Sequence, residues 1–282
     1  MKIVIGNHDL PITSVPDLLK QYQEKFKLCK FGKCDNFYHY NNDAVHFLII
    51  NSEEEYPIKR TGPQYNFVES DLKAASSDPS IKWIVVAFHT PMYAALWPTA
   101  TAMPHLGVYY EQFVINLRES YHPLFDKYGV DLVLQGHSHS YQRTYPLIFD
   151  NTSPPSILSS ISHNPPLITS NSTDTYVNPK GEIYVTIGTA GIGLDNIGTN
   201  GNWITTTRSD DHYFAKVDDD NYGFLDLELN EDRSSLTGIF YSNDLVPEPS
   251  GANESRTANV PLFRGFPTMG HEVIDYFTIS KS

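Results

Sequence analysis

The chain has 282 residues, of which 40% are hydrophobic, and a formal net charge of -13. A chain of this length can bury a large core in one domain. The acidic balance argues against nucleic acid as a partner, because binding a phosphate backbone requires clustered Lys and Arg. No apolar run approaches the roughly 20 residues that a membrane-spanning helix needs, so no membrane partner is expected. A small phosphorylated substrate is still allowed, since a bound metal ion can supply local positive charge.

The first part of the chain alternates between strand and helix patterns. Short runs rich in β-branched residues predict strands, and apolar residues at helical spacing predict helices. In chain order we expect a strand at Lys2–Ile5, a helix capped by Ser14, a hairpin of Asn36–Tyr40 and Ala44–Asn51, a helix at Gln64–Ser76 and a strand before His89. His39 and His46 lie in the hairpin and are interpreted as ordinary strand histidines.

The second part of the chain begins with the same alternation, which predicts an α/β layer architecture. It then becomes rich in Ser, Pro, Thr and Asn over residues 146–180, which we interpret as a surface insertion in a single domain spanning residues 1–282. The expected elements are a loop at Ala94–Leu106, a helix at about Tyr109–Tyr128 that breaks or restarts at Pro123, a strand at Val130–Gln135, a strand at Glu182–Ile187, a hairpin of Tyr222–Leu229 and Ser235–Tyr241, and a last strand at Gly270–Ser280.

A pair of histidines follows the strand at Val130–Gln135. In the stretch Gly-His-Ser-His-Ser-Tyr-Gln-Arg, Gly136 marks the end of the strand, and His137 and His139 come directly after it. Two imidazoles one residue apart can point into one cleft, and neutral imidazole is a ligand for zinc, iron and manganese. Taken alone, the pair could equally be surface loop histidines.

Two other strand-like runs end in a side chain that can bind a metal. Asn7 follows the first strand after Gly6, and His89 ends the run that precedes Pro91. In α/β proteins, sites form at the carboxyl ends of strands. We therefore expect Asn7, His89 and the histidine pair to converge on one metal centre.

The glycine-rich turn at residues 188–193 follows the strand at Glu182–Ile187. No Gly-Lys-Ser/Thr follows it, so it is not a phosphate-binding P-loop. The better interpretation is close packing of the backbone near the site. The remaining histidines, which have no motif around them, are interpreted as packing or solvated residues: His122, His163, His212 and His271.

Three stretches in this order resemble the calcineurin-like metallophosphoesterases: Gly-Asn-His-Asp at Gly6, Phe-His-Thr-Pro-Met-Tyr at Phe88 and Gly-His-Ser-His-Ser-Tyr-Gln-Arg at Gly136. The last two are similar to those of the purple acid phosphatases, in which Glu is usual where this chain has Gln142. The resemblance implies an α/β/β/α sandwich of two facing mixed β-sheets flanked by helices. Arg143, beside the histidine pair, is interpreted as a structural anchor.

The resemblance also implies roles for individual residues in the hydrolysis of phosphate monoesters. The family centre holds two metals, iron with zinc, manganese or a second iron. Carried over to this chain, Asn7, His89 and His137 would hold one divalent metal, and His139 would contribute to the other. His8 would face the substrate as a catalytic residue, although a structural turn residue is the alternative. His105 is the second candidate for a substrate-facing histidine.

Part of the family pattern has no counterpart in these 282 residues. The Gly-Asp-x-Gly and Gly-Asp-x-x-Tyr motifs precede Gly-Asn-His-Asp in the family, and only six residues precede Asn7 here. We therefore expect the first strand-helix-strand to be lacking, the chain to be cut short, at most one divalent metal to bind, and activity to be impaired. The alternatives are a non-catalytic metal-binding or interaction module, and a phosphodiesterase or nucleotidase on the same fold.

Several features are typical of a secreted protein, and the resemblance implies a phosphorylated small molecule or phosphoprotein as the substrate. Three Asn-x-Ser/Thr sequons suggest a glycoprotein. Cys29 and Cys34 could form a small-loop disulfide in an oxidising compartment, or could be free thiols. The sequence indicates no oligomeric state. The sequons begin at Asn151, Asn171 and Asn253.

Overall fold

The computed structural model describes most of the chain, namely residues 2–6, 29–30, 33–34, 36–53, 60–95, 104–152, 156–158, 161–163, 165–190, 194, 211–242 and 272–282. The predicted helix capped by Ser14, the turn carrying Asn7 and His8, and the sequon at Asn253 lie outside these residues. For His105 and for the two cysteines, the structure describes the backbone alone.

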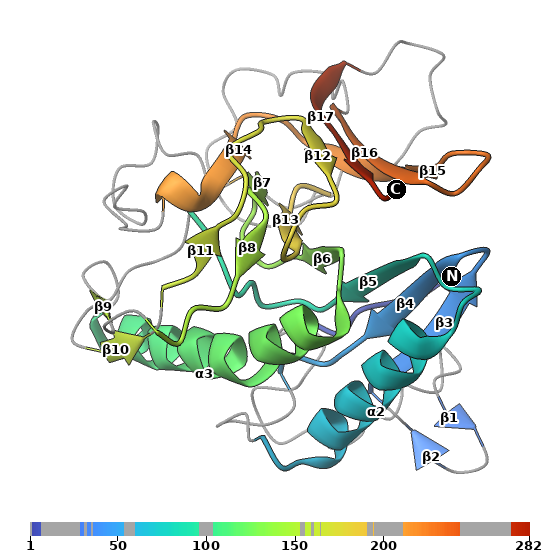
Figure 1. Ribbon diagram of the computed structural model, residues 1–282. Coiled ribbons are helices and arrows are strands. Elements are labelled where there is room, and N and C mark those ends of the chain that lie inside the picture. Colours follow the sequence, from blue (N-terminus) through green and yellow to red (C-terminus); the bar gives the residue numbers. More distant parts are fainter. Residues whose placement is uncertain are drawn as a thin grey trace.

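Seven strands form the larger sheet, in the order β14-β7-β13-β6-β5-β4-β3 (Figure 1). The four neighbours β13, β6, β5 and β4 run parallel, whereas β3 pairs antiparallel with β4, and β7 pairs antiparallel with β13 and β14. The carboxyl ends of the parallel strands therefore meet at one edge of the sheet. The bounds are β3 Tyr38–Asn42, β4 Val45–Ile49, β5 Trp83–Ala87, β6 Leu132–Gln135, β7 Tyr141–Thr144, β13 Ile183–Ile187 and β14 Phe214–Asp218.

A smaller mixed sheet, in the order β12-β17-β16-β15, faces the larger one. Its strand β12 pairs parallel with β17, and its other neighbours pair antiparallel. A buried apolar cluster fills the space between the sheets, with Trp83 and Val85 of β5 on one side and Phe240 and Phe277 on the other. The prediction of two facing mixed sheets is confirmed. The bounds are β12 Thr175–Val177, β15 Gly223–Leu229, β16 Ser235–Ser242 and β17 Val273–Ser280.

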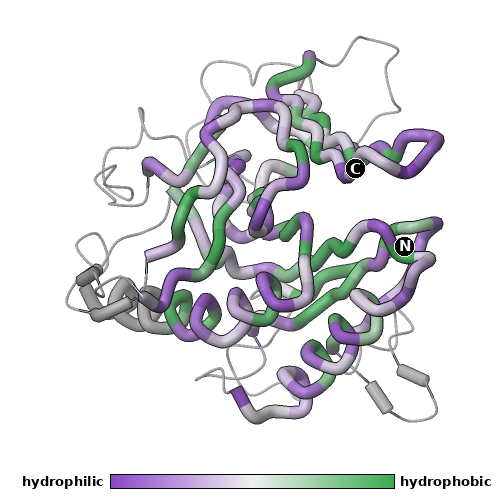
Figure 2. Tube along the Cα trace, in the orientation of Figure 1, coloured by the Kyte–Doolittle hydropathy of each residue, from purple (hydrophilic) through white to green (hydrophobic). Residues whose placement is uncertain are grey.

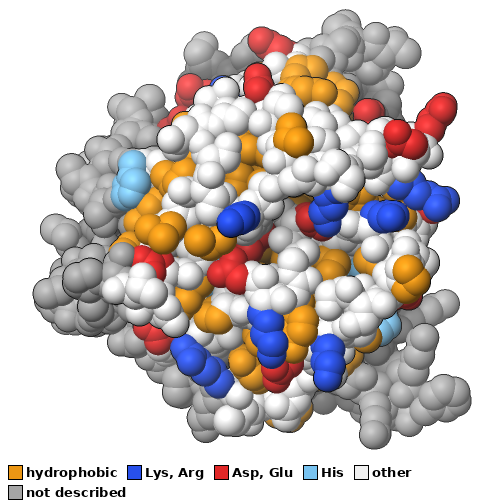
Figure 3. Space-filling model, viewed as in Figure 1, with side chains coloured by type: hydrophobic (Ala, Val, Ile, Leu, Met, Phe, Trp, Pro, Cys, Tyr) orange, Lys and Arg blue, Asp and Glu red, His pale blue; other side chains and the backbone are white. Residues whose placement is uncertain are grey.

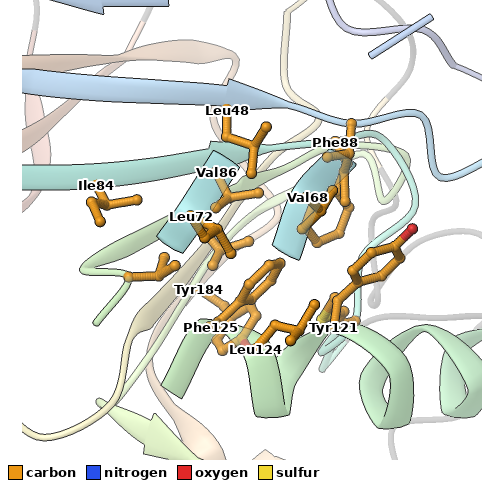
Figure 4. Packing of buried hydrophobic residues seen from close by; sticks show 14 of the residues in the cluster. Leu48, Val68, Leu72, Ile84, Val86, Phe88, Tyr121, Leu124, Phe125 and Tyr184 are labelled. Carbon is orange, nitrogen blue, oxygen red and sulfur yellow. The ribbon is translucent and has the colours of Figure 1, made fainter. Parts of the chain in front are cut away.

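Two helices, α2 (Pro63–Ser77) and α3 (Pro104–Tyr128), cover the other face of the larger sheet (Figure 1). Figure 4 shows how the second core forms: Val68 of α2 and Phe125 of α3 point toward Val86 of β5. Figure 2 shows the corresponding pattern along the chain, with hydrophobic residues in β4 and β5 and hydrophilic residues at the turn between β15 and β16. The layered α/β architecture therefore follows from burying both faces of one sheet.

Short pairs of strands complete the described structure. β1 (Cys29–Lys30) pairs antiparallel with β2 (Lys33–Cys34), and this register places Cys29 opposite Cys34. Between residues 146 and 180, β8 pairs with β11, and β12 joins the smaller sheet. The interpretation of this region as an insertion stays a prediction. The remaining bounds are β8 Leu147–Ile148, β9 Ser156–Leu158, β10 Ile161–His163, β11 Leu167–Ile168 and the 3-10 helix η1 Asp211–Tyr213.

Three local predictions were wrong. Lys2–Ile5 is not a strand, because the Tyr38 hydroxyl accepts a hydrogen bond from the Ile3 N–H at 2.9 Å and donates one to the Ile3 carbonyl at 2.8 Å, in place of a neighbouring strand. The helix predicted from about Tyr109 begins at Pro104, a residue suited to the first helical turn. The same helix continues through Pro123, because its neighbours Tyr121, Leu124 and Phe125 pack into the core and offset the lost hydrogen bond.

Arg143 joins the two sheets. Its guanidinium, on β7, donates to both carboxylate oxygens of Asp275 on β17, with Nε 2.6 Å from Oδ2 and the second nitrogen 2.9 Å from Oδ1. It also donates to the Tyr176 hydroxyl at 2.8 Å and to the Thr173 carbonyl at 2.8 Å. Tyr141 donates its hydroxyl to the same carboxylate at 2.7 Å. Each guanidinium nitrogen of this buried arginine therefore donates a hydrogen bond, in agreement with its interpretation as a structural anchor.

A buried polar cluster lies between α3 and β13. His122 Nδ1 is 2.8 Å from the Tyr93 hydroxyl, and its Nε2 is 3.1 Å from Oε1 of Glu182. Burial lowers the pKa of His122 to about 3. Burial and the adjacent Asp126 carboxylate raise the pKa of Glu182 well above its usual range. His122 is thus a neutral packing residue, as predicted.

The lowered pKa of His122 predicts that the contribution of this residue to stability falls in acid. The unfolded chain binds a proton on this imidazole below pH 6.5, whereas the folded chain does so only below about pH 3. The free energy of unfolding should therefore fall between these values as the pH falls, by up to about 1.4 kcal/mol per pH unit from this group. Urea unfolding of the wild type and His122→Gln over this range checks it, because Glu182, whose contribution has the opposite sign, is present in both. Equal slopes would contradict the prediction.

Candidate metal centre

Two of the predicted ligands meet at the carboxyl edge of the larger sheet. His89 follows β5 and His137 follows β6, and Nε2 of His89 lies 3.0 Å from Nδ1 of His137. The ring centroids are 5.0 Å apart and the rings are nearly perpendicular, at 82°. The parallel register of β5 and β6 brings the two rings together, because it pairs Ala87 with Leu134 and so ends both strands at the same edge of the sheet.

Backbone contacts fix the position of the His89 ring. The Gly136 N–H donates to the His89 carbonyl at 2.9 Å. A Cβ atom on Gly6 would lie 2.8 Å from Nδ1 of His89, so the backbone at residue 6 packs directly against this imidazole. Asn7 and His8 follow Gly6 in the chain, outside the described residues. Their roles as ligand and catalytic residue stay predictions.

Hydrogen bonds among neighbouring residues hold the bend that carries the histidine pair. His137 has a positive φ of 67°, a conformation that a non-glycine residue rarely adopts. The Gln142 amide donates to the Ser138 hydroxyl at 2.9 Å and to the Ser140 hydroxyl at 2.7 Å, on either side of His139. His139 is partly exposed, as are His89 and His137. The structure thus places all three imidazoles on the loops that follow β5 and β6.

Sequence reasoning missed the polar side chains that join these loops. Gln135 accepts a hydrogen bond from the Met92 N–H at 2.6 Å, and Gln142 accepts one from the Ala95 N–H at 2.6 Å. Both amides are buried. For Gln135 the signal is a glutamine at the end of an otherwise apolar strand, because a buried amide requires hydrogen-bond partners. Gln142 lies in the polar strand Tyr141–Thr144, which offers no such signal.

A carboxylate from a third strand end also reaches this region. Glu53, shortly after β4, accepts hydrogen bonds from the Thr90 hydroxyl and, at 2.9 Å, from the Ser52 hydroxyl. Thr90 is the residue next to His89, and its N–H donates to the Ser52 hydroxyl at 2.9 Å. No motif marks Glu53 in the sequence, so only the fold reveals that it lies near His89.

His105, the second predicted catalytic residue, belongs to the first turn of α3. The loop expected over Ala94–Leu106 is therefore wrong at its end, for the reason given for Pro104. The position of the His105 side chain lies outside the described part of the structure.

Gly188 packs against the histidine bend, as the interpretation of the glycine-rich turn predicted. A Cβ atom at this position would lie 1.8 Å from the carbonyl oxygen of Ser138, which is backbone and cannot rotate away. The Gly188 N–H also donates to the Ser140 carbonyl at 3.2 Å. The carboxyl end of β13 therefore supports the loop that presents His137 and His139.

This contact predicts the effect of Gly188→Ala. The added methyl group must displace the bend at Ser138, which moves both imidazoles away from His89. We expect divalent-metal affinity to fall by about 10–100-fold, the range seen when the supports of ligands are lost. Calorimetric titration with Zn²⁺ measures the change, and Gly129→Ala, where a Cβ atom would meet nothing within 4 Å, is the control for a strained glycine site. Unaltered affinity in Gly188→Ala would show that the bend tolerates displacement.

The donor set fits a divalent transition metal. Two ligands of one tetrahedral zinc ion, bound at about 2.0–2.1 Å, lie about 3.3 Å apart. The nearest nitrogens of His89 and His137 are 3.0 Å apart. Imidazole nitrogen suits zinc, iron and manganese, the metals that the sequence resemblance implies. The ligands that could hold one ion are His89 and His137, together with Asn7. Among the described residues, His139 does not join His89 and His137 in a group of three whose ligand atoms all lie within 4.8 Å of one another, so its part in a second metal site stays a prediction.

The first half of the chain matches a protein-family model. The model of the calcineurin-like phosphoesterases aligns with residues 1–141, which include His89 and both histidines of the pair. The chain belongs to the calcineurin-like phosphoesterase family. Purple acid phosphatase 23 of Arabidopsis thaliana is 28% identical over 145 residues, which are 50% of this chain and 28% of that protein. Acid phosphatase type 7 of Homo sapiens is 29% identical over 129 residues, 45% of this chain and 26% of that protein.

A solved structure supports the fold of this family member. Purple acid phosphatase PPD1 from yellow lupin (Lupinus luteus) seeds superposes with a TM-score of 0.56 and 22% identity, covering 89% of this chain and 33% of that one. At this identity the likeness concerns the fold. This chain spans about a quarter of the length of the Arabidopsis and human phosphatases that it matches, 25% to 28%.

Surface features bear on the predicted location of the protein. Asn151 and Asn171, two of the three predicted glycosylation sites, are exposed. Neither described helix combines the length and the apolar composition that a membrane span requires. Glycosylation and secretion stay predictions.

Proposed function

We propose that this chain takes part in metal-dependent hydrolysis of phosphate monoesters, with the reaction centred on His89, His137 and His139. The observation that carries the proposal is the 3.0 Å approach of His89 and His137 at the ends of two parallel strands. The matched family and the acid phosphatases among its relatives support the reaction class. A divalent metal, when bound here, lowers the pKa of water and compensates the negative charge of a phosphate.

The chain's own residues divide the remaining tasks. His89 and His137 would hold one divalent ion through imidazole nitrogen, and His139 would contribute to a second metal. Asn7 would add an uncharged oxygen, so the centre would keep net positive charge for a phosphate group. We assign to His8 the protonation of the leaving-group oxygen, and to His105 a contact with the substrate. Gln142 and Gln135 hold the two loops in place through the hydrogen bonds described above.

The charge distribution supports a small or exposed phosphate ester as the substrate. The chain carries a net charge of -13. On the face shown in Figure 3, Lys and Arg side chains are interspersed with acidic and hydrophobic ones. A metal centre can attract one phosphate group in such surroundings, because its positive charge acts locally.

Chelation tests the proposal. The purified 282-residue chain should hydrolyse an aryl phosphate monoester at the impaired rate that the missing motifs predict, lose this activity when a chelator removes the metal, and regain it with Zn²⁺, Mn²⁺ or iron. An aryl phosphate diester, assayed in parallel, distinguishes a diesterase. Metal that binds without hydrolysis of either ester would contradict the enzymatic proposal and identify a non-catalytic metal-binding module.

A further inference from the structure

Two histidines and an aspartate meet at the edge of the larger sheet. His39 comes from the edge strand β3, His46 from β4 and Asp71 from α2. Each carboxylate oxygen of Asp71 faces one imidazole: Oδ2 lies 2.8 Å from Nε2 of His46, and Oδ1 contacts Nδ1 of His39. One ligand atom from each of the three residues lies within 4.8 Å of the others.

The fold, and not the spacing along the chain, creates this cluster. Asn41 pairs with His46 across the hairpin, and His39 lies two residues before Asn41, so all three side chains share one face of the sheet. That face meets α2, where Asp71 follows Phe67 by one helical turn. The Phe67 ring stacks on His39 with centroids 6.1 Å apart and covers one side of the cluster.

The hydrogen-bond partners of His46 place two acceptor oxygens against one imidazole ring. Its Nδ1 lies 2.7 Å from the Asn41 side-chain oxygen, and its Nε2 lies 2.8 Å from an Asp71 oxygen. A neutral imidazole has one N–H, so it can donate to one of these two acceptors only. If Nδ1–H donates to Asn41, the lone pair of Nε2 points at the carboxylate. A cation at this point would pair with both the lone pair and the carboxylate.

We infer that His39, His46 and Asp71 form a second metal site, for a divalent transition ion of the zinc class. Two neutral imidazoles and one carboxylate are the ligand types that such ions select, whereas Mg²⁺ and Ca²⁺ select oxygen. The Asn41 oxygen holds the His46 tautomer with Nε2 free for the ion, as outer hydrogen bonds do in zinc proteins. The side chains of His46 and Asp71 are each 5% exposed and that of His39 is 51% exposed, so the ion would enter from the His39 side.

This site is separate from the metal centre at His89. His46 pairs with Ile84 of β5, five residues before His89 in the chain. At a strand rise of about 3.3 Å per residue, the two sites lie about 16 Å apart, toward opposite ends of the parallel strands. A metal bound to His39, His46 and Asp71 would tie the β3–β4 hairpin to α2 and protect an edge strand. The inference does not depend on the proposed phosphatase activity.

Zinc titration of the full chain tests the second site. After removal of metal by a chelator, Zn²⁺ alone is titrated by calorimetry into the wild type, His39→Ala, Asp71→Asn and, as a control, His212→Ala, which changes an exposed histidine outside the cluster. We expect the His39 and Asp71 variants to lose one equivalent of zinc, or at least about tenfold in its affinity. His212→Ala should match the wild type. Zn²⁺ should also raise the Tm of the wild type more than that of His39→Ala.

A second variant keeps the test independent of folding defects. With Co²⁺ as the probe, His39→Cys should gain a thiolate-to-cobalt charge-transfer band that the wild type, which has the same two native cysteines, lacks. The inference is overturned if His39→Ala binds zinc with wild-type stoichiometry and affinity, or if His39→Cys shows the wild-type cobalt spectrum.

Discussion

Replacing Arg143 with leucine should lower the free energy of unfolding by about 3–5 kcal/mol, the cost of removing one partner of a buried ion pair. Arg143 is 1% exposed and makes the paired hydrogen bonds to Asp275 that connect the two sheets. Without the guanidinium, the carboxylate of Asp275, 9% exposed, loses its ionic partner and keeps the hydrogen bond from the Tyr141 hydroxyl. Urea unfolding monitored by circular dichroism measures the loss.

A matched exposed pair gives the control for Arg143→Leu. Lys127 and Glu69 lie 3.1 Å apart, with 57% and 41% of their side chains exposed. Lys127→Leu should cost less than about 1 kcal/mol, because water screens an exposed pair. Adding Asp275→Leu to Arg143→Leu should recover part of the loss, since no unpaired charge then stays buried. The structural role of Arg143 fails if Arg143→Leu is no more destabilising than Lys127→Leu.

Replacing His137 with alanine should abolish the proposed hydrolysis and the retention of metal at the centre. His137 provides one of the two imidazole nitrogens that approach to 3.0 Å. Loss of residues that merely support a ligand lowers metal affinity or activity by about 10–100-fold, so loss of a ligand should cost at least about 100-fold. Metal analysis and aryl phosphate hydrolysis, measured on the same preparation, check both effects. Thermal unfolding in the presence of chelator confirms that the variant is folded.

Replacing His89, the other histidine of this contact, gives an independent test of the same centre. His89→Ala, on the other loop, should show the same double loss, whereas His212→Ala should keep both metal and activity. The same losses from two loops would locate the ion between them. If His137→Ala hydrolyses the ester at the wild-type rate, the reaction does not take place at this centre, whatever metal the chain retains.

Local patterns predicted most of the elements because those elements are amphipathic or uniformly apolar. The helix at Gln64–Ser76 and the strand before His89 were found within one or two residues. The errors occurred where a tertiary contact outweighed a local rule. Pro123 lies inside α3 because packing against the sheet offsets the missing hydrogen bond. Ile3 bonds to the Tyr38 hydroxyl where a strand pairing was expected.

The candidate metal centre shows the same division. His89 and His137 could be named from the sequence, because an apolar run that ends in a metal-capable residue is a local signal. Glu53 could not be assigned to the region, because a single polar residue near a strand end has many possible partners. The cluster of His39, His46 and Asp71 could not be predicted from the sequence at all. His39 and His46 looked like ordinary strand histidines until α2 placed Asp71 between them.

The sequence by itself determined the alternation of strands and helices, the positions of the strand ends and the residues there that can bind a metal, because hydrophobic period and turn chemistry are local properties. Only the tertiary structure decided which of those residues meet: His89 with His137, Gly188 with the histidine bend, Arg143 with Asp275, and Asp71 with two histidines. The physical reason is that these contacts depend on strand order and register. Both are fixed by burying the two faces of the larger sheet at once, a condition on the whole chain that no local stretch expresses.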